Sequence, residues 1–128
     1  MNANFVDTNV VIYCVGDDQE KRSKALALLA TRPVLSAQVL NETAHTMRRK
    51  LRFEPAEISA VLLRMIQECH VVPITADATL SALNIADRYK FSIYDSLIIA
   101  AALDADCTTL YSEDLQHRQI IENQLTII

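Results

Sequence analysis

Four acidic side chains of this 128-residue chain stand where they could hold a metal ion. Asp7 follows an apolar run at residues 3–6, Glu42 lies within a helical stretch, Asp95 stands at a helix start, and Asp114 follows another apolar run. Carboxylates that meet in one cleft repel each other unless a cation joins them. Such oxygen donors suit Mg²⁺ or Mn²⁺, and a site of this kind is typical of phosphodiester chemistry.

Asp7 and Asp95 each have a structural interpretation beside the metal-binding one. Asp7 could cap the following helix, but Thr8 could do so equally well and leave Asp7 free, so we favour a metal ligand. Asp95 stands three residues after Ser92, which is the capping-box spacing. The spacing alone favours a structural and a functional role for Asp95 equally.

Glu42 and Asp114 are weaker signals when each is taken alone. The polar helix face from Glu42 to Arg49 could run from a metal to a phosphate chain, although a solvated face is the default interpretation. Asp114 could be an ordinary turn residue. Its position after a strand places it on the same sheet edge as Asp7, and the sequence does not choose between Asp114 and Glu113.

Alternating strands and helices would position these acids. Strands are predicted at residues 3–6, 33–35, 71–74, 108–111 and 125–128. Helices are predicted at residues 9–14, 19–30, about 38–51 and 55–68, followed by one that ends at residue 89 and one that begins after residue 92. This alternation predicts a parallel, doubly wound α/β sheet, in which ligands bind at the carboxyl ends of the strands.

The composition predicts one compact soluble domain that spans residues 1–128, with 51% hydrophobic and 22% charged residues. The net charge of −4 excludes a global basic field that would attract nucleic acid. The cations at residues 48, 49, 50 and 52 therefore form either a local phosphate-binding patch or ordinary charges at a helix C-terminus. The one glycine, Gly16, excludes a P-loop and a dinucleotide fingerprint.

The remaining composition indicates a cytoplasmic protein. The three cysteines form no CxxC pair and predict small buried side chains in a reducing compartment. No signal peptide is apparent, and the longest apolar run, residues 97–103, is much shorter than the roughly 20 residues of a membrane helix. The histidines have no zinc-ligand spacing with one another or with the cysteines.

Three ordered motifs resemble those of the PIN-domain nucleases. Phe-Val-Asp-Thr-Asn at residues 5–9 is similar to the opening motif, residues 91–98 to the central one, and residues 112–117 to the closing one. The resemblance covers essentially the whole chain, and the small size and closing motif are most similar to the VapC-type toxins of bacterial type II toxin–antitoxin systems. It implies a three-layer α/β/α domain with a small, mostly parallel sheet of four to five strands.

The resemblance also implies roles for individual residues. Catalysis and metal binding fall to Asp7, Glu42, Asp95 and Asp114, so that Asp114 is preferred over Glu113. Substrate binding is expected of the polar residues around the acids and of one cation: Thr8, Asn9, Ser112 and Arg49.

The implied function is a metal-dependent endoribonuclease, with Mg²⁺ or Mn²⁺ as cofactor and RNA as substrate. The implied partners are a cognate antitoxin and a second copy in a homodimer. The helix at residues 55–68 carries more apolar residues than one core-facing stripe needs, which indicates either an antitoxin groove or burial on two sides. The alternatives are a PIN-like binding module without catalysis and a phosphatase with Asp7 as covalent nucleophile, which would usually have an acid at position 9.

Two features depart from the family pattern. Arg118 stands where the family often has glycine, and the sequence stops at residue 128 without the usual longer tail. The first is expected to alter the loop that bears Asp114 and the second to shorten the last strand. Neither change removes one of the four acids.

Overall fold

The computed structural model describes residues 3–128, in which six strands form one sheet in the order β3-β2-β1-β4-β6-β5. All neighbouring strands are parallel except β5 and β6, which are antiparallel. The strands are β1 (Ala3–Val6), β2 (Val34–Ser36), β3 (His70–Val72), β4 (Cys107–Tyr111), β5 (Ile120–Ile121) and β6 (Leu125–Ile127).

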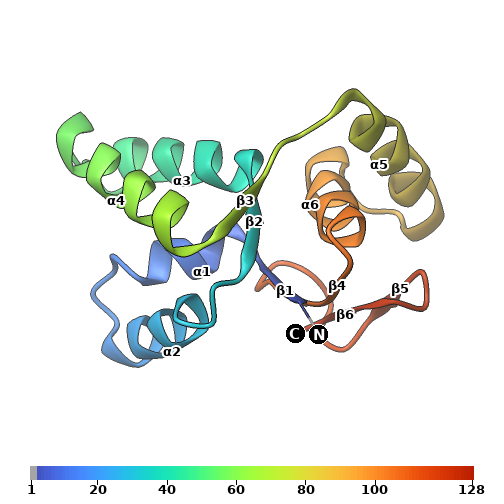
Figure 1. The fold of residues 1–128 in the computed structure, drawn as a ribbon, viewed down its shortest axis with the longest axis horizontal. Helices are drawn as coiled ribbons and strands as arrows, with labels where there is room; N and C mark the ends of the chain where they lie inside the picture. The colour runs from blue at the N-terminus through green and yellow to red at the C-terminus, as the bar shows by residue number, and fades with distance from the viewer. Residues whose placement is uncertain (1–2) are drawn as a thin grey trace.

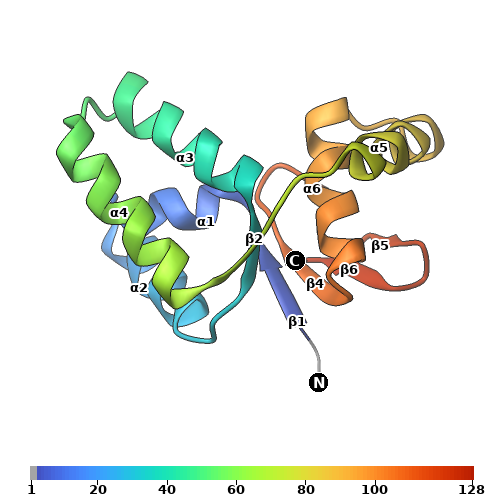
Figure 2. The ribbon, with the colours of Figure 1, turned by 45° about the horizontal axis from the view of Figure 1, so that its top comes forward.

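Six helices cover the two faces of this sheet. They are α1 (Thr8–Tyr13), α2 (Gln19–Leu29), α3 (Ala37–Arg49), α4 (Pro55–Glu68), α5 (Ala76–Tyr89) and α6 (Ile93–Asp104). Helices α1 to α4 lie on one side of the sheet, and α5 and α6 lie on the other (Figures 1 and 2). The mostly parallel α/β fold with three layers is therefore confirmed.

The sheet has six strands, whereas the sequence predicted four to five. The additional strand, β5, has only two residues, and it reaches β6 through a turn in which Glu122 and Asn123 both have positive φ angles of 52° and 54°. Glycine and asparagine usually mark such turns. Because the first turn position is a glutamate, the sequence did not indicate a turn here. The two residues of β5 are also too few to show a periodic pattern.

Arg118 has a φ angle of 69°, in the left-handed region that favours glycine. A residue with a side chain loses on the order of 1 kcal/mol there. The backbone N–H of Arg118 still donates to the carbonyl of Ile127 at 2.6 Å, which joins this loop to β6. The departure from the family pattern therefore coincides with a strained backbone position, while the loop remains tied to the sheet.

The core lies on both faces of the central strands. Phe5 and Val6 of β1 are fully buried, because β1 pairs with β2 on one side and β4 on the other. Cys69 and Cys107 are buried as well and Cys14 is half-buried, and burial raises the pKa of each thiol to about 11. These thiols are thus mainly protonated at neutral pH.

Helix α6 explains the longest apolar run of the sequence. It packs between the sheet and α5, and its residues Ile98 to Ala102 are all buried. A helix that is apolar on all sides is expected when it is covered by protein on all sides. Among residues 3–128, no helix combines the length and the apolar character that a membrane span requires.

The strand order places the acids at one edge of the sheet. Strands β1 and β4 are parallel neighbours with Val6 opposite Tyr111, so the residues that follow them, Asp7 and Ser112, emerge side by side. The backbone N–H of Asp7 donates to the carbonyl of Tyr111 at 3.0 Å and extends this pairing. Strand β2 ends at the same edge and continues directly into α3, which carries Glu42.

Candidate active site

Asp7 is a buried carboxylate at the carboxyl edge of the sheet, with only 5% of its surface exposed. Its Oδ1 accepts the backbone N–H of Thr8 at 2.7 Å, and its Oδ2 accepts the hydroxyl of Ser112 at 2.9 Å. Asp7 is therefore the N-cap of α1, and the expectation that Thr8 would cap this helix and leave Asp7 free is wrong. Burial raises the pKa of Asp7, the two hydrogen bonds lower it, and the charges of Glu42 and Asp114 raise it further. The net direction is upward, so ionised Asp7 is in an unfavourable environment without a cation.

Glu42 lies beside Asp7 and is held through both of its oxygens. The Thr8 hydroxyl donates to Oε2 at 2.9 Å, and the side-chain amide of Gln38 donates to Oε1 at 2.7 Å. Thr8 thus contacts both acids, through its backbone N–H and its hydroxyl. The polar helix face to which Glu42 belongs is therefore not a freely solvated one at this position.

Gln38 is a residue that the sequence analysis did not identify. It is 6% exposed, and its Nε2 donates both to Glu42 and to the Tyr94 carbonyl at 3.1 Å. Its Oε1 is buried and has no hydrogen-bond partner among residues 3–128. Gln38 thus joins α3 to the first turn of α6. Its position four residues before Glu42, on the same helix face, could have indicated it from the sequence.

Replacing Gln38 by Met is expected to lower the free energy of unfolding by about 2 kcal/mol, since it removes one neutral and one charge-assisted hydrogen bond at a buried site. Gln67→Met is the matched control, because Gln67 is exposed on α4 and should change stability by less than about 0.5 kcal/mol. Urea unfolding of both variants measures the difference. Equal stability of the two variants would contradict the role assigned to Gln38.

Asp95 lies in the first turn of α6, where its backbone N–H donates to the hydroxyl of Ser92 at 3.1 Å. Ser92 is therefore the N-cap of this helix. Burial raises the pKa of Asp95, the Ser92 side chain lowers it, and the charges of Asp114 and Glu42 raise it. Asp95 thus lies within the electric field of Asp114 and Glu42, the same two acids whose charges act on Asp7.

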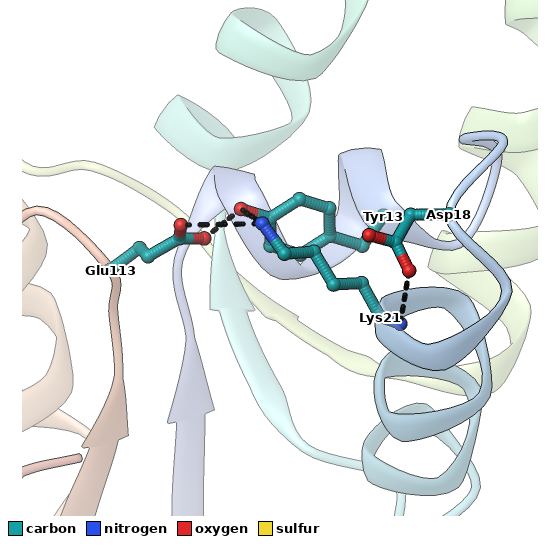
Figure 3. A network of polar contacts seen from close by, with 4 residues as sticks. All are labelled: Tyr13, Asp18, Lys21 and Glu113. Carbon is teal, nitrogen blue, oxygen red and sulfur yellow. Dashed lines mark hydrogen bonds and ion pairs between the residues drawn. The ribbon is translucent and has the colours of Figure 1, made fainter.

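The structure separates Asp114 from its neighbour Glu113. Asp114 lines the same cleft as Glu42. Glu113 instead accepts the hydroxyl of Tyr13, and its Oε1 lies 3.8 Å from Nζ of Lys21, which also lies 4.8 Å from the centre of the Tyr13 ring (Figure 3). Glu113 therefore ties the loop after β4 to α1 and α2, while Asp114 remains available to the cleft.

A cleft of about 620 Å³ lies between α1 and α3; Glu42 and Asp114 line it, whereas Asp7 and Asp95 do not. Thr8 and Asn9 line it at the end nearest Asp7, and Lys50 and Leu51 line it beyond the last turn of α3. Arg49, for which substrate binding was expected, is exposed and does not line the cleft. The cation that does so is the next residue, Lys50.

The oxygen donors of this site fit a hard divalent cation by their chemistry. In residues 3–128 no three His, Cys, Asp or Glu side chains form a ready-made metal cage. Mg²⁺ does not require one, because it usually binds through one or two carboxylates and keeps several waters. The raised pKa of buried Asp7 is the observation that favours a cation here, since a positive charge would offset its desolvation.

Residues 5–123 match the sequence pattern that defines the PIN domain. No curated protein matches the chain in sequence.

Several solved structures are similar in fold. VapC20 of Mycobacterium tuberculosis, described as a sarcin–ricin loop cleaving toxin, has a TM-score of 0.71 and 23% identity over 88% of this chain and 90% of its own. A chain of DNA-bound VapBC from Salmonella typhimurium has a TM-score of 0.72 and 20% sequence identity, over 100% of this chain and 98% of its own. A chain of VapBC2 from Rickettsia felis, bound to a DNA fragment from its promoter, has a TM-score of 0.70 and 17% sequence identity over 98% of both chains. At these identities the similarity shows a shared fold.

Proposed function

Because the chain belongs to the PIN domain family, we propose that it is a divalent-metal-dependent endoribonuclease that hydrolyses RNA phosphodiester bonds. One observation carries the proposal. Thr8 bridges the carboxylates of Asp7 and Glu42 at the carboxyl edge of the sheet, where burial raises the pKa of Asp7 and the charges of Glu42 and Asp114 raise it further. The proposed cofactor is Mg²⁺ or Mn²⁺, with Asp7, Glu42, Asp95 and Asp114 as its ligands.

The residues of the chain position the acids and do not supply a nucleophile. Ser112 and the Thr8 backbone hold the two oxygens of Asp7, while the Thr8 hydroxyl and Gln38 hold those of Glu42. When bound, the divalent ion acidifies water for attack on phosphorus and neutralises charge on the phosphoryl oxygens. Glu42 is proposed to bind the ion either directly or through water.

Substrate contacts are proposed for residues around the acids. Asn9 is half-buried beside Asp7 and lines the cleft, so its amide can reach a ribose or phosphate oxygen. Thr8 and Ser112 lie at the same edge but are engaged with carboxylates, which limits them to contacts through a remaining lone pair. Arg49 lies on the exposed surface, so it can contact an RNA strand only where that RNA leaves the cleft.

A cognate antitoxin and a second copy of the chain are the proposed protein partners. Two of the similar structures are VapBC complexes. Helix α4 buries Ile58 and Met65 toward the domain but leaves Leu63 and Ile66 more than half exposed. It therefore has an apolar face that the described residues do not cover, as an interface helix would. A purified protein that is monomeric and binds no co-expressed antitoxin would count against this part of the proposal.

Metal titration followed by an RNA-cleavage assay tests the proposed activity. The protein should show no cleavage in EDTA and should regain it with millimolar Mg²⁺ or Mn²⁺. Metal binding and RNA binding without cleavage would instead indicate a PIN-like binding module. A trapped acyl-phosphate on Asp7, formed from a simple phosphate ester, would indicate a phosphatase.

A further inference from the structure

The cleft beside the acids has two walls that are each one face of a helix. Thr8 and Ile12 are four residues apart on α1, and Glu42 and Thr46 are four residues apart on α3, so each pair projects from a single side. From Glu42 to Lys50 the α3 wall rises by about 12 Å, at about 1.5 Å per residue. Phosphates of a stacked strand are spaced about 3.4 Å along its axis, so this length spans more than one nucleotide.

The far end of the cleft carries a cation without a partner. Lys50 forms no ion pair within the part of the chain that the structure describes. Arg48, from the same basic cluster, lies 3.7 Å from Oε2 of Glu54 and donates to the Phe53 carbonyl at 3.2 Å. Because the protein has a net charge of −4, an available cation in the same cleft as Glu42 and Asp114 is a local signal for a phosphate.

Apolar and amide groups complete the walls. Ile12 and Leu51 provide apolar surface, and Asn9 and Asn41 provide side-chain amides. This combination suits an unpaired base, whose flat face packs on apolar groups and whose edge accepts and donates hydrogen bonds. Paired bases of a duplex present neither their faces nor their pairing edges to such a cleft.

We propose that the cleft between α1 and α3 binds nucleotides of single-stranded RNA that flank the scissile phosphate. Lys50 contacts a backbone phosphate, and Ile12 and Leu51 contact a base. The subsite rests on the proposed function, since cleavage takes place at the acidic end of the same cleft. Beyond that function, the subsite gives the Lys50 end of the cleft a role: it holds the RNA strand so that the scissile phosphate lies at the acids.

The test measures binding with cleavage silenced, so that the two proposals can fail separately. Asp7→Asn serves as the background, and a fluorescein-labelled, mixed-sequence single-stranded RNA is titrated by anisotropy in Mg²⁺ at several KCl concentrations. Adding Lys50→Gln should weaken binding roughly five- to tenfold and reduce the slope of log K against log salt by about 0.7. Adding Arg48→Gln, which removes the same charge from the same cluster, should change affinity by less than about twofold.

A second arm tests the base contact. Adding Leu51→Ala should weaken binding of the intact RNA roughly threefold and leave binding of an oligonucleotide with abasic riboses unchanged. Equal effects of Lys50→Gln and Arg48→Gln, unchanged affinity with Lys50→Gln, or equal loss for the intact and abasic strands would each overturn the subsite. Tighter binding of duplex RNA would overturn it as well. A wild-type protein that cleaves no RNA would refute the proposed function instead.

Discussion

Asp7→Asn is expected to lower metal-dependent RNA cleavage by on the order of 10³-fold while the protein remains folded. Asparagine has the same shape, its Oδ1 can accept the Thr8 N–H, and its amide can donate to Ser112. What it lacks is the negative charge that attracts the divalent ion. Single-turnover cleavage of an RNA substrate measures the loss, and circular dichroism shows whether the fold is retained.

The same substitution is expected to stabilise the metal-free protein at neutral pH. Burial raises the pKa of Asp7 above its ordinary value of 3.8, so the native state binds this proton more tightly than the unfolded state does. The resulting stability is fully present below pH 3.8 and is lost as the pH rises through the raised native pKa. Asparagine carries no charge that burial could destabilise, so the variant does not lose this stability as the pH rises.

Urea unfolding in EDTA across this pH range measures the effect. The free energies of unfolding of the wild type and the Asn variant should be similar at acidic pH and should diverge in favour of the variant as the pH rises. A difference that stays constant with pH would mean that the carboxyl group of Asp7 is not destabilised by burial.

Asp114→Asn is expected to lower kcat/KM for RNA by on the order of 10²-fold, whereas Glu113→Gln should change it by less than about threefold. The two residues are adjacent, but only Asp114 lines the cleft beside Glu42. Glu113 is exposed and its contacts with Tyr13 and Lys21 are those of a surface network, which contribute little to stability. Steady-state cleavage at saturating metal compares the two variants.

Metal affinity gives an independent readout of the same pair. Asp114→Asn should weaken Mn²⁺ binding in a calorimetric titration, and Glu113→Gln should leave it unchanged. If Glu113→Gln were the more damaging substitution in both measurements, the loop after β4 would have to adopt another orientation in the active protein.

The alternation of strands and helices was predictable from local sequence. Pro55 marks the start of α4, and the helix spans Pro55–Glu68 as expected. Runs of apolar residues predicted β1 and β4, and the rule for carboxyl strand ends led from these strands to Asp7 and to the pair Glu113 and Asp114, of which the family resemblance preferred Asp114. Helix α5 begins after Thr75, whose hydroxyl accepts the N–H of Ala78, the cap that a threonine before a helix usually forms.

What the sequence could not show depends on contacts between distant segments. Gln38 stands out only because its amide meets Glu42 and the Tyr94 carbonyl, which is 56 residues away. Lys50 and Arg48 are equivalent in a basic run, and only the fold directs one to the cleft and the other to Glu54. Such distinctions arise from packing and have no periodic or motif signal in the chain.

Carboxylates far apart in sequence are proposed to share one divalent ion at the sheet edge. Anomalous diffraction from crystals soaked in Mn²⁺ tests this proposal most directly. A manganese peak is expected within bonding distance of Asp7 and at least one more of the acids Glu42, Asp95 and Asp114. Crystals of protein that cleaves RNA with Mn²⁺, but with their manganese peak elsewhere, would contradict it.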